Sequence, residues 1–339
     1  MKKQKIQKSK WNASPVFQVV MLLILPIITQ SCQTSGAETK NDFKEETNME
    51  VAKVYITKEI TAESLMRIYE ALGREANGKR VAIKISTGEP GGNNYLKPAL
   101  IKNLVQSVNG TIIECNTAYG GKRSSTANHL KTARDHGFTA IADVDIMDKD
   151  GEVRIPVVGG KHIAEDIIGK NFLHYDFTVI LSHFKGHAMA GFGGAIKNMS
   201  IGIASANGKL WIHSGGKSTT GWGNPTQEEF LETMAEAAKA IADHCGDKII
   251  YINIMNNLSI DCDCDSNPAD PQMGDIGILA SLDPVALDKA CVDQVYASTD
   301  HGKIHLVKRM ESKNGIHAIE YGERIGLGTQ KYELISLDK

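Results

Sequence analysis

The sequence predicts an α/β fold, built on a mostly parallel sheet with helices on both of its faces. Apolar, β-rich runs alternate with segments of helical periodicity along most of the chain, which is typical of parallel strands joined by helices. Several of these runs are apolar throughout, as strands covered on both faces should be. No internal repeat is visible, and the pattern fits either one sheet or two α/β lobes.

Short runs rich in β-branched and other apolar residues predict six strands. In chain order they are 52–56, 81–85, 111–114, 178–181, 248–254 and 276–280. In open α/β sheets, ligands bind beyond the carboxyl ends of the strands, so functional residues are expected in the loops that follow them. These loops are 86–95, 115–124, 182–200 and 255–275.

Helices are expected between the strands, and four of them carry clear signals. They are 65–72, 100–108, 230–242 and 285–295. Apolar residues at helical spacing indicate the first two. Thr226 and Glu229 form a capping-box pattern ahead of the third. Asp283 and Pro284 supply an N-cap and a proline at the first position of the fourth.

The N-terminus has the features of an export signal over residues 1–31. Five lysines and no acid precede an apolar stretch at 16–28, which ends at Ser31-Cys32. The apolar stretch is short for a membrane span. This pattern predicts a lipoprotein signal in which Cys32 is acylated and becomes the mature N-terminus. The alternative is an uncleaved anchor with an incidental cysteine.

The exported chain is expected to be acidic and attached to a bacterial membrane by its lipid alone, on the periplasmic or cell-surface side. Residues 1–31 hold five of the 38 basic residues and none of the 40 acidic ones. A nucleic-acid partner needs a basic face, so this class of partner is excluded. Residues 32–50 are polar and cannot bury enough apolar surface to fold, which predicts a flexible tether ahead of an α/β body at 51–339.

The strongest functional signal is a block that follows the strand at 178–181. His183, Lys185, His187 and Lys197 lie within fifteen residues, among several glycines. In a helix the two histidines would share a face and suit one metal ion, while the glycines favour an extended loop equally well. The lysines are candidates for a base, a nucleophile or a counter-charge to an anion. The alternative is that they are surface charges and that the backbone satisfies the histidines.

A second signal is the pair Cys262 and Cys264, set among three aspartates. At this spacing the thiols are expected to be too close for an unstrained disulfide, and to suit a metal or a redox sensor better. Like-charge repulsion from the acids would raise the pKa of both thiols. The alternative is an acidic loop with two idle cysteines.

Two further loops offer weaker signals for an anion. The glycines in 86–95 would let backbone amides approach a ligand, although they serve equally to turn the chain. Arg123 has the fork geometry that binds a carboxylate or a phosphate, or it lies in a solvated turn.

These segments resemble the domain of unknown function 362 family, whose members are often labelled uncharacterised iron–sulfur centre proteins. The resemblance covers about 51–335 and rests on KISTGEPGGNNYLKP, on NTAYGGKRSSTANHLKTARDHGF, on the block from Ser182 to Ser214, on the DCDC loop and on DIGILASLDPVALDKACVD. A looser similarity, carried by a lysine-x-histidine loop after a strand, is to the nickel-pincer lactate racemase group. The chain has no ferredoxin-like insertion and no Cys-x-x-Cys motif, the usual ligand pattern of an iron–sulfur cluster.

The family's motif positions fall on most of the residues singled out above, and the chemistry of the side chains gives them expected roles. The expected metal ligands are His183, His187, His213, Cys262 and Cys264. The expected catalytic residues are Lys185 and Lys197. The expected substrate ligands are Lys84, Gly88, Glu89, Arg123 and Asn198. The metal is expected to be zinc, nickel or iron, and the substrate a small anion such as a hydroxy acid or a phosphate.

The family implies no particular activity, so two functions of different classes remain. The first is redox or proton-transfer chemistry on the small anion, at a lipid-anchored His/Lys/Cys site with a metal or iron–sulfur group. The second is a lipoprotein that captures an anionic small molecule without turning it over.

Overall fold

The computed structural model describes residues 51–339 apart from 266. The predicted signal peptide, Cys32 and the tether lie outside these residues, so the structure does not bear on them. None of the helices in the described part of the chain is long and apolar enough to cross a membrane.

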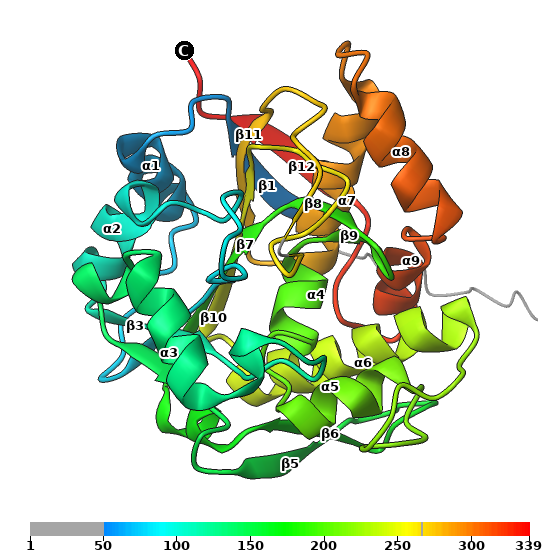
Figure 1. The fold of residues 1–339 in the computed structure, drawn as a ribbon. Coiled ribbons are helices and arrows are strands. Elements are labelled where there is room, and N and C mark those ends of the chain that lie inside the picture. Colours follow the sequence, from blue (N-terminus) through cyan, green and yellow to red (C-terminus); the bar gives the residue numbers. More distant parts are fainter. Residues whose placement is uncertain (1–50, 266) are drawn as a thin grey trace, which may run out of the picture. The chain divides into compact units, whose positions relative to one another are not determined.

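The described residues form one central sheet of eight strands, and not two lobes (Figure 1). Across the sheet the order is β12 (Tyr332–Ser336), β1 (Ala52–Thr57), β11 (Gly277–Ser281), β10 (Ile249–Met255), β7 (Phe177–His183), β2 (Val81–Lys84), β3 (Gly110–Glu114) and β4 (Val144–Ile146). Only β11 is antiparallel to its neighbours, β1 and β10. The predicted fold class is therefore confirmed, and all six predicted strands are present within one or two residues of their expected ends.

Helices cover both faces of this sheet, because alternate strand residues point to opposite sides. Val179 and Leu181 pack into one core with α1 (Ala62–Ala71), α2 (Pro98–Ser107) and α3 (Thr126–Asp135). Ile180 packs into the other core, with the helices of the second half of the chain. These are α4 (Ala195–Ser200), α5 (Ala206–His213), α6 (Gln227–Cys245), α7 (Pro284–Ala297), α8 (Lys303–Ser312) and α9 (His317–Arg324).

Local sequence signals set the starts of two helices as predicted. Thr226 and Glu229 make both hydrogen bonds of a capping box at α6. The Asp283 side chain accepts hydrogen bonds from the backbone N–H groups of Val285 and Ala286 at the start of α7. Each cap satisfies donors that a helix N-terminus otherwise leaves unpaired.

Strands β4 and β12 and helices α3, α4, α5, α8 and α9 were not predicted from the sequence. The smaller elements were not predicted either. They are the pair β5 (Glu152–Pro156) and β6 (Glu165–Gly169), the pair β8 (Lys185–His187) and β9 (Gly191–Gly193), and the 3₁₀ turns Lys122–Ser124, Phe138–Ala140 and Lys170–His174. The β8–β9 hairpin decides one open alternative. His183 ends β7 and His187 lies in β8, so the two histidines do not share a helix.

Candidate functional site

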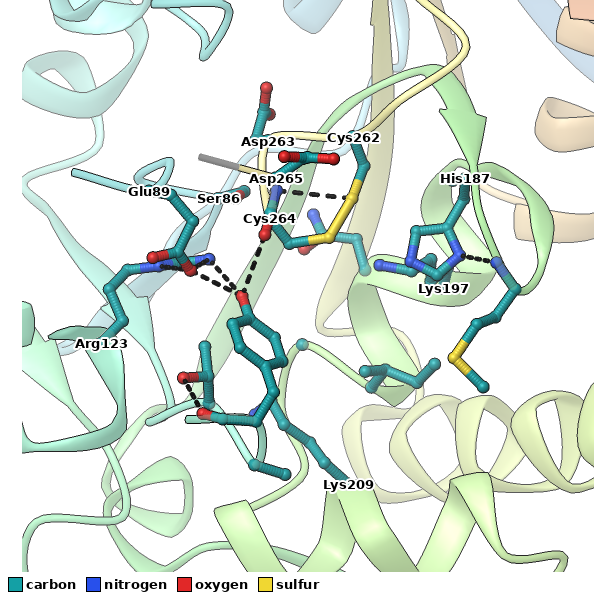
Figure 2. A pocket seen from close by; sticks show the side chains of 18 of the residues that line it. Ser86, Glu89, Arg123, His187, Lys197, Lys209, Cys262, Asp263, Cys264 and Asp265 are labelled. Atoms are coloured by element: carbon teal, nitrogen blue, oxygen red, sulfur yellow. Dashed lines mark hydrogen bonds and ion pairs between the residues drawn. A yellow bond between two sulfur atoms is a disulfide. The ribbon is translucent and has the colours of Figure 1, made fainter. Parts of the chain in front are cut away.

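A cavity of about 660 Å³ lies beyond the carboxyl ends of β2, β3 and β7, where the sheet topology predicts ligand binding (Figure 2). Residues from all four predicted loops line it, together with residues of α4 and α5. Every expected site residue in the described chain lines this cavity except Gly88.

One wall of the cavity is a buried ion-pair network. Lys84 Nζ lies 3.0 Å from Glu114 Oε2, and an Arg123 Nη lies 2.7 Å from Glu89 Oε1. Arg123 also reaches Glu114 at 3.4 Å. Burial alone would raise the pKa of Glu114, but Lys84, His129 and Arg123 hold it well below its usual range. Lys84 is thus paired with Glu114, and Arg123 with Glu89 and Glu114, so Arg123 does not lie in a solvated turn.

A second buried pair holds the cysteine loop in place. The Asp263 carboxylate is paired with Lys185 Nζ, and its other oxygen lies 3.2 Å from His183 Nδ1. Burial would raise the pKa of Asp263, but Lys185 and His183 lower it to about 2. His183 Nε2 contacts the Asn256 carbonyl oxygen at 2.6 Å. Because both ring nitrogens have protein partners, His183 is not available as the metal ligand that the sequence predicted.

Lys197 differs from Lys84, Arg123 and Lys185, the buried cavity cations described above, in lacking a counter-charge among the described residues. No hydrogen bond or ion pair joins its Nζ to any residue of the described chain. Burial and the nearby Lys84 and Lys209 lower the pKa of Lys197 to about 8. Lys209 is buried and donates only to the Ala204 carbonyl oxygen within the described residues. Lys209 was not among the predicted site residues, although its place one helical turn before His213 was a usable signal.

The two remaining histidines present opposite groups to the cavity. His187 Nδ1 accepts hydrogen bonds from the backbone N–H groups of Met189 and Ala190, at 3.2 and 3.0 Å, so its proton is assigned to Nε2. His213 Nδ1 lies 2.6 Å from the Lys209 carbonyl oxygen and donates to it, which leaves a lone pair on Nε2. Burial lowers the pKa of His187 well below its usual range and that of His213 to about 4.

Cys262 and Cys264 form a disulfide, whereas their spacing was expected to suit a metal or a redox sensor better than an unstrained disulfide. The chain turns at Asp263, where the Asp265 N–H donates to the Cys262 carbonyl oxygen, and the Cα atoms come 5.3 Å apart. This distance lies within the range that disulfides bridge. Two of the neighbouring acids are themselves paired, Asp263 with Lys185 and Asp261 with Arg309.

His187, Cys262 and Cys264 each place a potential metal-ligand atom within 4.8 Å of the others. The arrangement does not fit a metal ion as it stands. Disulfide sulfurs are not thiolates, and His187 presents an N–H group to the cavity instead of a lone pair. His213 is not part of this group. The histidine and cysteine ligands predicted from the sequence therefore form an incomplete set.

The fold and the site define an α/β protein with a cationic cavity at its sheet edge. Residues 81–293 match the family model described as "Domain of unknown function (DUF362)", and the chain belongs to that family. No curated protein matches the chain.

Two solved structures are similar at low identity. One is the lactate racemase apoprotein from Thermoanaerobacterium thermosaccharolyticum, with 17% identity and a TM-score of 0.37, over 61% of this chain and 51% of that one. The other is a protein from Thermotoga maritima, with 13% identity and a TM-score of 0.40, over 79% of this chain and 59% of that one. This chain thus spans between half and two thirds of their length.

The two lysines of the central block should affect stability in opposite directions. Lys197→Met removes a cation without a counter-charge, so the free energy of unfolding should rise by about 1 kcal/mol near neutral pH. Lys185→Met leaves the Asp263 carboxylate without its main partner, and unfolding should become easier by about 3 kcal/mol. Urea unfolding of the purified variants measures both.

The gain from Lys197→Met should depend on pH. Its pKa is about 8 in the folded protein against an ordinary value of 10.5. The cost of the charge is therefore fully present below pH 8 and disappears as the pH rises towards 10.5. A Lys197→Met variant less stable than the wild type at pH 7 would show that Lys197 is held by partners.

Proposed function

We propose that the cavity binds a small organic anion, with Lys197 and Lys209 supplying the attracting charge. The observation that carries this proposal is the imbalance of charge in the cavity. Lys84, Arg123 and Lys185 are paired with carboxylates, whereas Lys197 and Lys209 have no carboxylate partner in the described chain. A carboxylate or phosphate group in the cavity would supply the counter-charge that these lysines lack, and the N–H of His187 adds a further donor.

The same residues support proton transfer next to the bound anion. A lysine with a pKa of about 8 is present as both acid and base at neutral pH, which suits a general acid or base. The lone pair of His213 Nε2 supplies a second acceptor. We therefore favour proton abstraction at the carbon that carries the carboxylate, with a 2-hydroxy acid as the substrate class.

Binding of lactate and of inorganic phosphate to the full chain tests the charge assignment. Either anion should raise the melting temperature in a concentration-dependent way. Lys197→Met and Lys209→Met should each weaken binding by about tenfold, the effect of losing roughly 1.4 kcal/mol. Lys102→Met, on the exposed side of α2, is the matched control and should bind as the wild type does. Equal binding by Lys197→Met and the wild type would refute the assignment.

A binding lipoprotein without turnover is the alternative function, and the same cavity would serve it. The two differ in whether the carbon-bound hydrogen of lactate exchanges with solvent. Mass spectrometry of lactate incubated with the full chain in deuterium oxide distinguishes them. Exchange that increases with pH, is half-maximal near pH 8 and levels off above it supports the base role of Lys197, and stable lactate supports simple binding.

A second candidate is metal binding by His187, Cys262 and Cys264, which the short distances between their ligand atoms favour. It requires reduction of the disulfide and a turn of the His187 ring to expose a lone pair. Zinc, nickel or iron would suit such a set of ligands. The reduced full chain should then bind one equivalent of metal, and Cys262→Ser with Cys264→Ser should abolish binding. Equal metal content in the two proteins would exclude this group as the site.

Attachment to a membrane through a lipid on Cys32 remains a proposal that rests on the sequence pattern of the export signal. Mass spectrometry of the N-terminal peptide from the membrane fraction tests it. An unmodified Cys32, or an intact peptide that precedes it, would contradict lipoprotein processing.

A further inference from the structure

The Cys262–Cys264 disulfide lies in the wall of the cavity, on the loop that the Asp263 pair holds (Figure 2). Both cysteines are half-buried, so their sulfur atoms border the space that a ligand would fill. The stabilisation that a disulfide gives grows with the length of chain that it encloses. This disulfide encloses only Asp263, which Lys185 and His183 already hold. The disulfide therefore adds little to the stability of the fold, and we look for a chemical role instead.

The hydrogen bonding makes the two sulfur atoms unequal. The backbone N–H of Cys264 donates to Cys262 Sγ at 3.4 Å. A donor on sulfur stabilises a thiolate, so Cys262 is the better leaving group and Cys264 the sulfur that a nucleophile would attack. The ring of His187 lies within 4.8 Å of both sulfurs, and its Nε2–H is a second donor to an anionic sulfur.

The charge of the cavity selects the nucleophile. Attack on a disulfide needs a thiolate, and Lys197 and Lys209 favour a thiol that also carries a carboxylate. Asp261 and Asp263, which would repel such a molecule, are paired with Arg309 and Lys185, whereas Asp265, which also lines the cavity, has no cation partner in the described chain. This selection rests on the anion site of the proposed function.

We propose that the Cys262–Cys264 disulfide exchanges with a small carboxylate-bearing thiol bound in the cavity. The thiolate attacks Cys264 Sγ, a new sulfur–sulfur bond forms, and the electron pair of the broken bond passes to Cys262 Sγ. A second thiolate then attacks the sulfur of the first, which releases the Cys264 thiolate. Two thiols are oxidised to one small disulfide, the protein disulfide is reduced by two electrons, and the two cysteines take up the two protons.

The test compares the reduction of the oxidised full chain by mercaptoacetate and by neutral 2-mercaptoethanol, at equal thiolate concentrations. Alkylation and mass spectrometry follow the appearance of free Cys262 and Cys264. The ratio of the reduction rate with mercaptoacetate to that with 2-mercaptoethanol should be about tenfold higher for the wild type than for Lys197→Met, as expected for the loss of one charge contact. Lys102→Met is the matched control and should keep the wild-type preference.

Methylthioacetate, which has the carboxylate but no thiol, provides a second measurement on the wild type alone. This (methylthio)acetate should bind in the cavity and slow the reduction of the disulfide by mercaptoacetate. It should slow the reduction by 2-mercaptoethanol less. If it binds and mercaptoacetate leaves the disulfide intact, the exchange is refuted and the anion site stands. If it does not bind and the two thiols react alike in wild type and Lys197→Met, both proposals fail.

Discussion

The carboxylate of Asp263 is the constraint on which the cavity depends. It pairs with Lys185 on β8 and with His183 at the end of β7, while its backbone carbonyl oxygen accepts the N–H of Glu89. Three loops from different parts of the chain therefore meet at one residue. Gly186 permits this contact, because a Cβ there would lie 2.3 Å from the Ile260 carbonyl oxygen. A buried charge is costly unless it is paired, so the loop that carries Asp263 is stable only in the position where its carboxylate meets these partners.

The remaining charges of the cavity form two groups with different consequences. Lys84, Glu89, Glu114 and Arg123 neutralise one another in a buried network, which makes a rigid polar wall. Lys197 and Lys209 are left with positive charge and no carboxylate. Rigid walls with unmatched charge favour an anionic ligand, since little reorganisation is needed when it enters. The disulfide borders the same space, so binding and sulfur chemistry would share one cavity.

The position of the site could be derived from the sequence, but the roles of its residues could not. Polar residues after successive parallel strands must meet at one sheet edge, and the predicted loops do line the cavity. Pairing, however, depends on partners 78 to 80 residues away, as for Lys185 and His183 with Asp263. Nothing in the local sequence separates Lys185, which is paired, from Lys197, which is not. The same holds for His183, whose nitrogens are both occupied by distant partners.

The α/β class, six of the eight strands of the main sheet, the caps of α6 and α7 and the edge of the sheet where the site lies could be derived from the sequence alone. These features follow from apolar periodicity and local hydrogen bonding, which act between residues close in the chain. The folded structure was needed to establish that there is one sheet, that Cys262 and Cys264 are paired, and that His187 offers a proton instead of a lone pair. The single sheet depends on pairing between strands that are far apart in the sequence. The cysteine pairing and the His187 proton depend on local turns, which contacts with distant residues hold in place.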